Sequence, residues 1–377
     1  MAMDTGAWAA DAPPGYAEDT LPGQWLPDLL GPGFEYTTLA AGEDEDGPLC
    51  ATLVRHVPES PPEHPADHGP RLRGMVAGLV EFATQHHHEP GPPVPAVLAL
   101  HGWTDYFYNV ELARYWTRRG YRFYALDLRR YGRSLRAWST PGFTTNLSEY
   151  DADLEAAFAA MAADVGTLGN VVCVAHSTGG LIASLWADRN PGRFSALVLN
   201  SPWLETQGSW LVRNAAAGLL DPVARRRPKT RLKLPEVESY WQSMSREAHG
   251  HWDLHPLWRP RRSFPVTAGW LTAVMAGHAA VARGLDIREP ILVLTAGRTR
   301  FGTVYDSEML RADSVIEVDT VRQRAVGLGR EVSVVRVSGA MHDIFASALP
   351  ARRAAYAAVS RWAGGYLPAL AEEHRRS

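Results

Sequence analysis

Short apolar runs of strand length alternate with longer stretches of helical periodicity along most of the chain. The runs predict eight strands, at residues 34–39, 49–57, 94–101, 121–128, 171–176, 196–201, 291–296 and 332–337. Helical patterns stand between or after the later strands, at residues 106–119, 146–163, 178–189 and 350–370. Strands separated by helices favour parallel pairing, right-handed crossovers and helices on both faces. We therefore expect an α/β fold with a mostly parallel eight-stranded sheet, whose functional site lies at the carboxyl ends of the strands.

Three segments depart from this alternation. Residues 1–33 are rich in Pro and Gly and predict a loosely ordered arm. Residues 59–93 combine many Pro and His residues with one short helical patch at 72–84, which indicates an insertion between strands. Residues 202–289 lack a strand pattern and carry six of the 13 tryptophans, so we expect a helical cap over the carboxyl edge of the sheet. The core domain then consists of residues 34–201 and 290–377.

The composition argues against several classes of function. The formal net charge of −3 does not fit a nucleic-acid-binding protein, which is normally basic. Cys50 and Cys173 both fall in predicted strands, which favours buried free thiols over a disulfide or a zinc site. Three consecutive histidines cannot all face one metal ion from a regular element, so a solvated loop is favoured for His86, His87 and His88. We expect neither a metal nor another cofactor.

The N-terminal sequence and the hydropathy pattern bear on location. Residues 1–20 contain acids and prolines and lack the basic-then-apolar pattern of a signal peptide. No apolar run approaches the length of a membrane span. A reducing cytoplasm is therefore the expected default location.

A turn of small residues around one serine follows a buried strand. The hexapeptide Ala175-His176-Ser177-Thr178-Gly179-Gly180 joins the strand at 171–176 to the helix at 178–189. Such a turn is typical of a nucleophile elbow, which lifts the serine Oγ above a helix N-terminus that stabilises negative charge. The turn requires small residues two before and two after the serine, and Ala175 and Gly179 meet this requirement. Ser177 is therefore the candidate nucleophile.

A serine hydroxyl needs an adjacent base to act as a nucleophile at neutral pH. His342 is the candidate, because it lies on a loop after the late strand at 332–337. His176 adjoins Ser177, but its side chain should point away from the serine Oγ. Three histidines of the predicted cap either contact substrate or cap local turns: His249, His251 and His255.

The base in turn needs a carboxylate that orients it and stabilises the imidazolium. The usual place is just after the strand at 291–296, but Gly297-Arg298-Thr299-Arg300 stands there. Asp313 is our candidate, and Asp306 and Asp319 are its rivals. The other place for the acid, after the preceding strand, holds Asn200.

The oxyanion of an acyl-transfer reaction needs two backbone donors. One donor is expected to be the amide of Thr178, the residue after the nucleophile. The other is expected to be the amide of Trp103, because Gly102 lets the preceding backbone approach a ligand closely. Cap tryptophans form either a small core of the cap or a substrate-facing wall. The candidate substrate contacts are His101, Gly102, Trp203 and Trp252.

These motifs together resemble the α/β-hydrolase superfamily, and within it the monoacylglycerol lipase/lysophospholipase branch, also called the serine aminopeptidase-like hydrolases. The resemblance covers about residues 34–370 and rests on five ordered segments: 100–103, 127–134, 176–180, 313–316 and 339–343. The chain order Ser, Asp, His is that of the superfamily. Three features depart from the branch pattern. Ala175 replaces Gly, Arg130 and Tyr131 stand where Gly and His are common, and the path to Asp313 is longer.

The resemblance implies hydrolysis of a carboxylic ester through an acyl-enzyme on Ser177, with His342 as base and Asp313 as orienting acid. The aromatic cap favours a small-molecule substrate with an apolar acyl or aromatic part. Amide, peptide or thioester hydrolysis, and biosynthetic acyl transfer or cyclisation, would use the same triad and stay open as alternatives. The basic segment 225–233 favours a solvated face over contact with an anionic headgroup or membrane surface.

Overall fold

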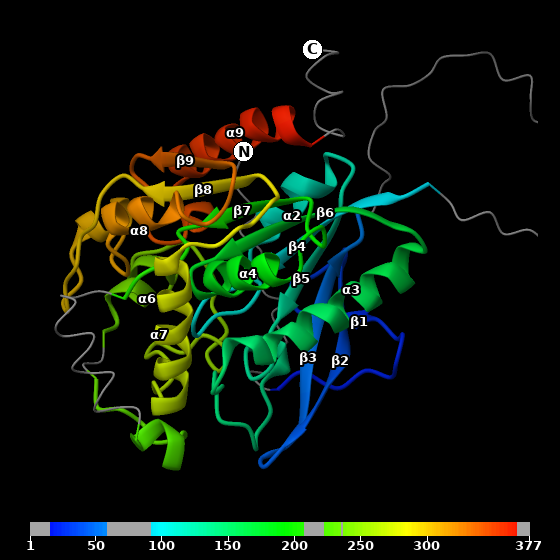
Figure 1. Ribbon diagram of the computed structural model, residues 1–377, viewed down its shortest axis with the longest axis horizontal. Coiled ribbons are helices and arrows are strands. Elements are labelled where there is room, and N and C mark those ends of the chain that lie inside the picture. Colours follow the sequence, from blue (N-terminus) through cyan, green and yellow to red (C-terminus); the bar gives the residue numbers. More distant parts are fainter. Residues whose placement is uncertain (1–15, 59–91, 207–221, 235–236, 368–377) are drawn as a thin grey trace, which may run out of the picture.

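Nine strands form one sheet in the computed structural model, which describes residues 16–58, 92–206, 222–234 and 237–367. Their order across the sheet is β1-β2-β3-β5-β4-β6-β7-β8-β9 (Figure 1). The strands are β1 (Leu26–Pro27), β2 (Phe34–Asp44), β3 (Gly47–His56), β4 (Val94–Leu100), β5 (Arg122–Asp127), β6 (Leu168–His176), β7 (Ala196–Asn200), β8 (Ile291–Ala296) and β9 (Val332–Val337). All eight strands expected from the sequence are present, and the predicted fold class is confirmed.

The sheet is parallel from β5 to β9 and antiparallel at its other edge. Neighbours in the order β5-β4-β6-β7-β8-β9 run parallel, whereas β1, β2, β3 and β5 pair antiparallel. The ninth strand corrects the expected number of eight, because Leu26–Pro27 pairs with β2. Parallel strands end at the same edge, so the loops after β4, β6, β8 and β9 converge there.

Helices cover both faces of the sheet. They are α2 (Val110–Thr117), α3 (Asp151–Val165), α4 (Thr178–Arg189), α6 (Ser239–Met244), α7 (Ala268–Arg283), α8 (Val318–Ala325) and α9 (Leu349–Tyr366). Buried residues of α2 and α9 share one core layer with the sheet, and those of α3 and α4 share the other. In Figure 1, α3 and α4 lie in front of the sheet.

Strand β6 illustrates how the apolar sequence builds these two layers. Val172 and Val174 belong to the layer of α2 and α9, whereas Cys173 and Ala175 belong to the layer of α3 and α4. This follows from the two-residue side-chain period of a strand that is buried on both faces. Cys50 and Cys173 are both buried and free, which confirms the thiol prediction.

Buried ion pairs join part of the predicted arm to the core. The Arg133 side chain is fully buried, with its Nε 2.6 Å from Asp28 Oδ2 and its Nη1 2.8 Å from Asp127 Oδ2. Its Nη1 also donates to the Phe107 carbonyl oxygen at 3.0 Å. The expectation of a loose arm is therefore wrong for β1 and Asp28, while residues 1–15 lie outside the described residues.

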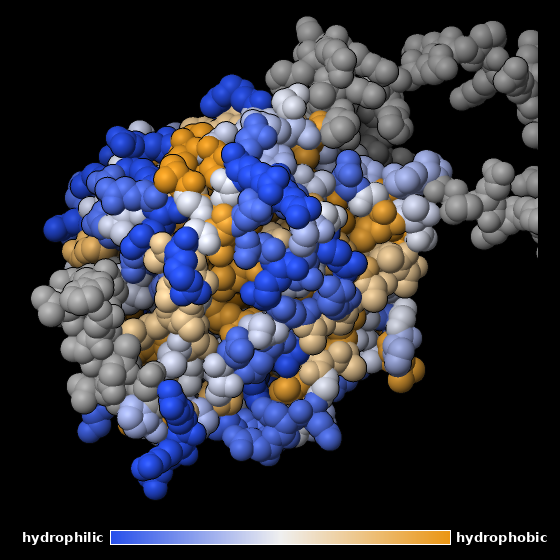
Figure 2. Space-filling view, viewed as in Figure 1, coloured by the Kyte–Doolittle hydropathy of each residue, from blue (hydrophilic) through white to orange (hydrophobic). Residues whose placement is uncertain are grey.

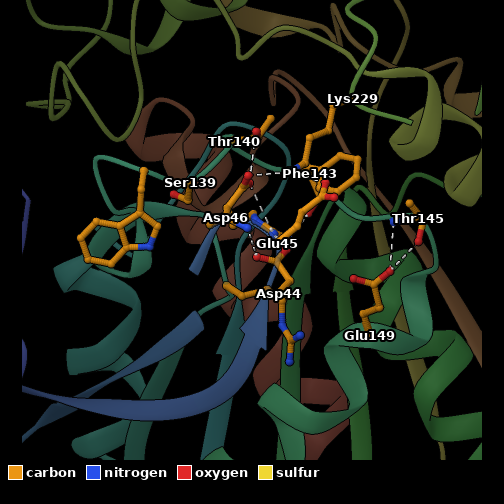
Figure 3. A network of polar contacts seen from close by, with 12 residues as sticks. Asp44, Glu45, Asp46, Ser139, Thr140, Phe143, Thr145, Glu149 and Lys229 are labelled. Carbon is orange, nitrogen blue, oxygen red and sulfur yellow. Dashed lines mark hydrogen bonds and ion pairs between the residues drawn. The ribbon is translucent and has the colours of Figure 1, made fainter. Parts of the chain in front are cut away.

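The turn between β2 and β3 contacts the segment predicted as the cap (Figure 3). The Lys229 Nζ lies 2.6 Å from Asp46 Oδ1 and 2.7 Å from Glu45 Oε1. Arg130, at φ +64°, pairs with Asp44 of the same turn. Arg130, which departs from the pattern of the lipase branch, thus binds the turn between β2 and β3. Lys229, a cation of the basic segment 225–233, is paired within the protein.

The segment between β7 and β8 contains α6 and α7, and α7 packs against α4. The side chains of Trp252, Trp258 and Trp270 are buried within the same continuous core as α3 and α4. These three tryptophans therefore do not form a separate core of the cap. The cap boundaries at residues 202 and 289 remain a prediction.

The surface carries both apolar and hydrophilic regions, and Figure 2 shows apolar patches between hydrophilic side chains on one face. Across the described residues, we find no helix whose length and apolar character would let it traverse a bilayer. Several sequence predictions fall outside the described residues: the helical patch at 72–84, the His86–His88 loop and Trp210.

Replacing Arg133 with glutamine should lower the free energy of unfolding by about 3–5 kcal/mol, because Asp28 and Asp127 would stay buried without their cation. Urea unfolding followed by circular dichroism measures this difference. Arg330→Gln is the matched control, because it breaks an exposed ion pair with Asp286 and should change little. Equal effects of the two substitutions would contradict the structural role of Arg133.

Candidate active site

Ser177 occupies a backbone turn that tolerates few residues. Its dihedral angles are φ +51° and ψ −118°, between the end of β6 and the start of α4. A Cβ at Gly179 would lie 2.3 Å from the His101 carbonyl oxygen, and one at Gly102 would lie 3.0 Å from the Ser177 Cβ. Ala175 is completely buried, and the fold accommodates its methyl group. The turn therefore needs glycine at 179, whereas a methyl group is tolerated at 175.

Three candidate residues form one hydrogen-bonded chain. The His342 Nε2 lies 3.0 Å from the Ser177 Oγ, and the His342 Nδ1 lies 2.9 Å from the Asp313 Oδ2. A carboxylate only accepts, so Nδ1 is the protonated nitrogen and Nε2 accepts from the serine hydroxyl. All three side chains are buried. The structure thus brings together Ser177, His342 and Asp313 from loops after three different strands.

The position of Asp313 depends on an excursion of the chain after β8. Thr299 and Asp313 form a parallel bridge, with the Arg300 amide donating to the Asp313 carbonyl and the Asp313 amide donating to the Arg298 carbonyl. The chain thus turns away from the line of β8 after Arg300 and returns at Asp313, which lies beside Thr299. The amides of Val315 and Ile316 then donate to the Asp313 Oδ1, each at 2.8 Å, and leave Oδ2 for His342.

The two rival acids have other partners. Asp306 caps the 3-10 helix Ser307–Arg311 and pairs with Arg300 at 2.5 Å. Asp319 pairs with Arg322 on α8, and its side chain is 73% exposed. Asp313 is the member of this set that the structure brings to His342.

The loop that carries His342 is held in place by residues that our sequence analysis did not assign to the site. Asn200, at the end of β7, donates to the Asp343 Oδ1 at 2.7 Å and accepts from the Ile344 amide at 3.0 Å. The Tyr108 hydroxyl donates to the Asp343 Oδ2 at 2.8 Å. Burial raises the pKa of Asp343, but nearby His176, Asn200, Tyr108 and Arg259 outweigh it and hold the pKa below its usual value. The sequence signal for Asn200 was its place as a polar residue at the end of a buried strand.

The expected oxyanion donors lie on either side of Ser177. Thr178 is the first residue of α4, and Trp103 follows the Gly102 that packs on Ser177. In the part of the chain that the structure describes, neither backbone amide donates to a protein acceptor. Both remain available to a ligand oxygen, as an oxyanion site requires.

The proposed substrate contacts separate into two groups. The ring of Trp270, which the sequence did not single out, lies 3.8 Å from that of Trp103 and 5.9 Å from that of Trp203. The Trp203 amide donates to the Ser177 carbonyl at 3.0 Å. We call this cluster of three neighbouring rings the aromatic wall.

Of the other three candidates, Gly102 lies against Ser177, as described above, and His101 and Trp252 have structural contacts instead. The His101 Nε2 accepts from the Leu128 amide at 3.1 Å, and its Nδ1 lies 2.8 Å from the Gly102 carbonyl oxygen. The Trp252 Nε1 donates to the Ala346 carbonyl at 2.8 Å, and its ring packs on Tyr108. Neither side chain therefore offers a free polar group to a ligand at Ser177.

The fold and the site define an α/β hydrolase. The sheet is mostly parallel with helices on both faces, a serine stands at the elbow turn, and the three site residues follow the chain order Ser, Asp, His. Residues 91–346 match the family described as serine aminopeptidase, S33. The chain belongs to this family of hydrolases.

Known proteins support the same assignment. The chain is 28% identical over 249 residues to a monoacylglycerol lipase of Mycolicibacterium smegmatis, which covers 64% of this chain and 82% of that protein. The crystal structure of a Paleococcus ferrophilus monoacylglycerol lipase matches with a TM-score of 0.52 at 18% identity, over 72% of this chain and 95% of that one. A putative hydrolase from Agrobacterium vitis S4 matches with a TM-score of 0.51 at 14% identity, over 87% and 98% of the two chains. The two structural matches concern the fold.

Replacing Gly179 with alanine should destabilise the elbow, because the new methyl group would overlap the His101 carbonyl oxygen. We expect the free energy of unfolding to fall by about 1–3 kcal/mol, as for other overpacked sites. Gly365→Ala in α9 is the control, because nothing lies within 4 Å of its added Cβ. Thermal unfolding of both variants checks this, and an unchanged Gly179→Ala midpoint would contradict the packing argument.

Proposed function

We propose that the protein is a serine hydrolase that cleaves carboxylic esters of small molecules through an acyl-enzyme on Ser177. The observation that carries this proposal is the buried chain Asp313–His342–Ser177, with contacts of 2.9 and 3.0 Å. An ionised acid, a neutral imidazole and a hydroxyl in this order are the parts that activate a serine.

The geometry supports a two-step reaction. The Ser177 Oγ attacks the ester carbonyl while His342 Nε2 takes the hydroxyl proton, and Asp313 stabilises the resulting imidazolium. The amides of Trp103 and Thr178 donate to the tetrahedral oxyanion. His342 then gives its proton to the leaving alcohol. In the second step, water gives a proton to His342 and attacks the acyl carbonyl, and Ser177 leaves with a proton from His342.

Within the aromatic wall, the half-buried rings of Trp103 and Trp203 pack on the buried Trp270 and support a substrate with an apolar acyl or aromatic part. Flat apolar rings bind such groups through burial of apolar area. The monoacylglycerol lipase relative also supports an ester among the possible acyl substrates. A monoacylglycerol lipase, lysophospholipase or carboxylesterase activity fits these features.

A fluorophosphonate probe should label the protein at Ser177, because the probe reacts with an activated serine and mimics the tetrahedral intermediate. Intact-mass analysis should show one adduct on the wild type and none on Ser177→Ala. Labelling that persists in Ser177→Ala, or that is absent from the wild type, would overturn the proposed function.

A series of p-nitrophenyl esters with increasing acyl length tests the substrate class. We expect kcat/KM to rise with chain length, since each buried methylene adds about 0.8 kcal/mol at most. Labelling at Ser177 together with negligible turnover of the whole series would contradict the ester assignment and favour an amide, a thioester or an acyl acceptor other than water.

Asp313→Asn should lower kcat by about 10³–10⁴-fold, because an amide cannot orient His342 and stabilise its protonated form as a carboxylate does. Asp319→Asn and Asp306→Asn should remain close to wild type, because these carboxylates pair with Arg322 and Arg300 instead. Steady-state kinetics on the best ester distinguishes them. A large loss in Asp319→Asn or Asp306→Asn, with Asp313→Asn active, would assign the acid differently.

A further inference from the structure

Three successive residues of the loop after β4 are held by one segment of the predicted cap. The Phe264 amide donates to the Thr104 Oγ1 at 3.0 Å, and the Arg259 Nη1 donates to the Asp105 Oδ1 at 2.5 Å. The His255 amide donates to the hydroxyl of the third residue, Tyr106, at 3.1 Å. The two segments therefore run in opposite directions and contact each other at three consecutive loop positions.

We propose that the cap segment 255–264 positions the loop 102–106 for catalysis, with Arg259 and Asp105 as the central pair. This inference rests on the proposed function, in which the Trp103 amide donates to the oxyanion. The residues of this contact are positioning residues, because they act through the backbone of Trp103 and do not touch the reacting atoms.

The backbone of the loop explains why it needs such a contact. Thr104, the residue after Trp103, has φ +51°. A β-branched residue rarely adopts this conformation, and such strain persists only where the surroundings enforce it. The Thr104 hydroxyl receives its hydrogen bond from the cap. The cap therefore supplies part of the force that keeps the Trp103 amide in place.

The core fixes the same loop one residue beyond the cap contacts. The Phe107 amide donates to the Asp127 Oδ1 at 2.8 Å, and the Phe107 carbonyl accepts from the Arg133 Nη1 at 3.0 Å. These bonds anchor the far end of the loop to Asp127 at the end of β5 and to Arg133. The orientation of residues 103–106 depends in addition on the cap.

The Arg259–Asp105 pair is buried, with exposures of 5% and 3%. Each charge is stable there only while its partner is present. The Arg259 guanidinium carbon also lies 5.3 Å from the ring centres of Tyr108 and Tyr240, and the Tyr240 ring lies 5.3 Å from that of His342. One cap arginine thus contacts both the loop with the expected oxyanion donor and a tyrosine packed on the candidate base.

The test compares catalysis in variants that remove single contacts. Tyr106→Phe and Thr104→Ala each delete one acceptor, and Arg259→Gln deletes the ion pair. The readouts are kcat and KM for the best ester and the Ki of a trifluoromethyl ketone with the same acyl chain. The ketone adduct on Ser177 carries an oxyanion, so its affinity reports the oxyanion site, whereas a general loss of packing would act on stability alone.

We expect kcat to fall about tenfold in Tyr106→Phe and Thr104→Ala and about a hundredfold in Arg259→Gln, with KM within about twofold. The ketone Ki should rise by the same factors, and Thr104→Ser should recover most of the kcat lost in Thr104→Ala. Arg246→Gln, which breaks an exposed cap ion pair with Asp253, should match wild type. An unchanged kcat and Ki in Tyr106→Phe and Thr104→Ala would overturn the proposal, even if Arg259→Gln does not fold.

Hydrogen–deuterium exchange separates this proposal from the ester hypothesis. In a Ser177→Ala background, Tyr106→Phe, Thr104→Ala and Arg259→Gln should each speed exchange of the amides of residues 102–106, while the strands of the sheet stay protected. This readout needs no substrate. Faster exchange in these variants, together with no ester turnover by the wild-type protein, would support the cap contact and reject the ester. Unchanged exchange would overturn the cap contact.

Discussion

The close approach of the His101–Gly102 backbone to the Ser177 turn is the constraint on which the candidate site depends. Parallel pairing sets Leu100 of β4 level with Ala175 of β6, so both strands end at the same height. The space between their following loops then admits hydrogen but no methyl group at Gly179. The register of β4 and β6, the glycine at position 179 and the expected oxyanion site therefore depend on one another.

Much of this arrangement could be predicted from the sequence, because its signals are local. Apolar runs of strand length identified eight strands within a few residues of most of their ends. The elbow at Ser177 was visible because a tight turn restricts its immediate neighbours. His342 was visible because it follows a strand closely in the chain. Each of these inferences needed only residues that lie near one another in the sequence.

The remaining features depend on contacts between distant residues. Asp313 was the candidate acid chosen from the sequence over two rivals, but its route to His342, through a bridge to Thr299, has no local signal in the intervening residues. Asp28 meets Arg133 across 105 positions, so β1 was read as part of an arm. The cap contacts with Thr104 and Tyr106 span 160 and 149 positions. Such pairs have no periodic signature, and the tertiary structure alone determines which polar residues meet.

The burial of the two cysteines has a consequence for their reactivity. Burial raises the pKa of Cys50 to about 11 and raises that of Cys173 as well. The thiolate is the reactive form, so a raised pKa leaves less of it at neutral pH. Cys50 and Cys173 are the only sulfhydryl groups of the chain. Electrophilic reagents should therefore react little with these two thiols. The folded protein should also tolerate air without an added reductant.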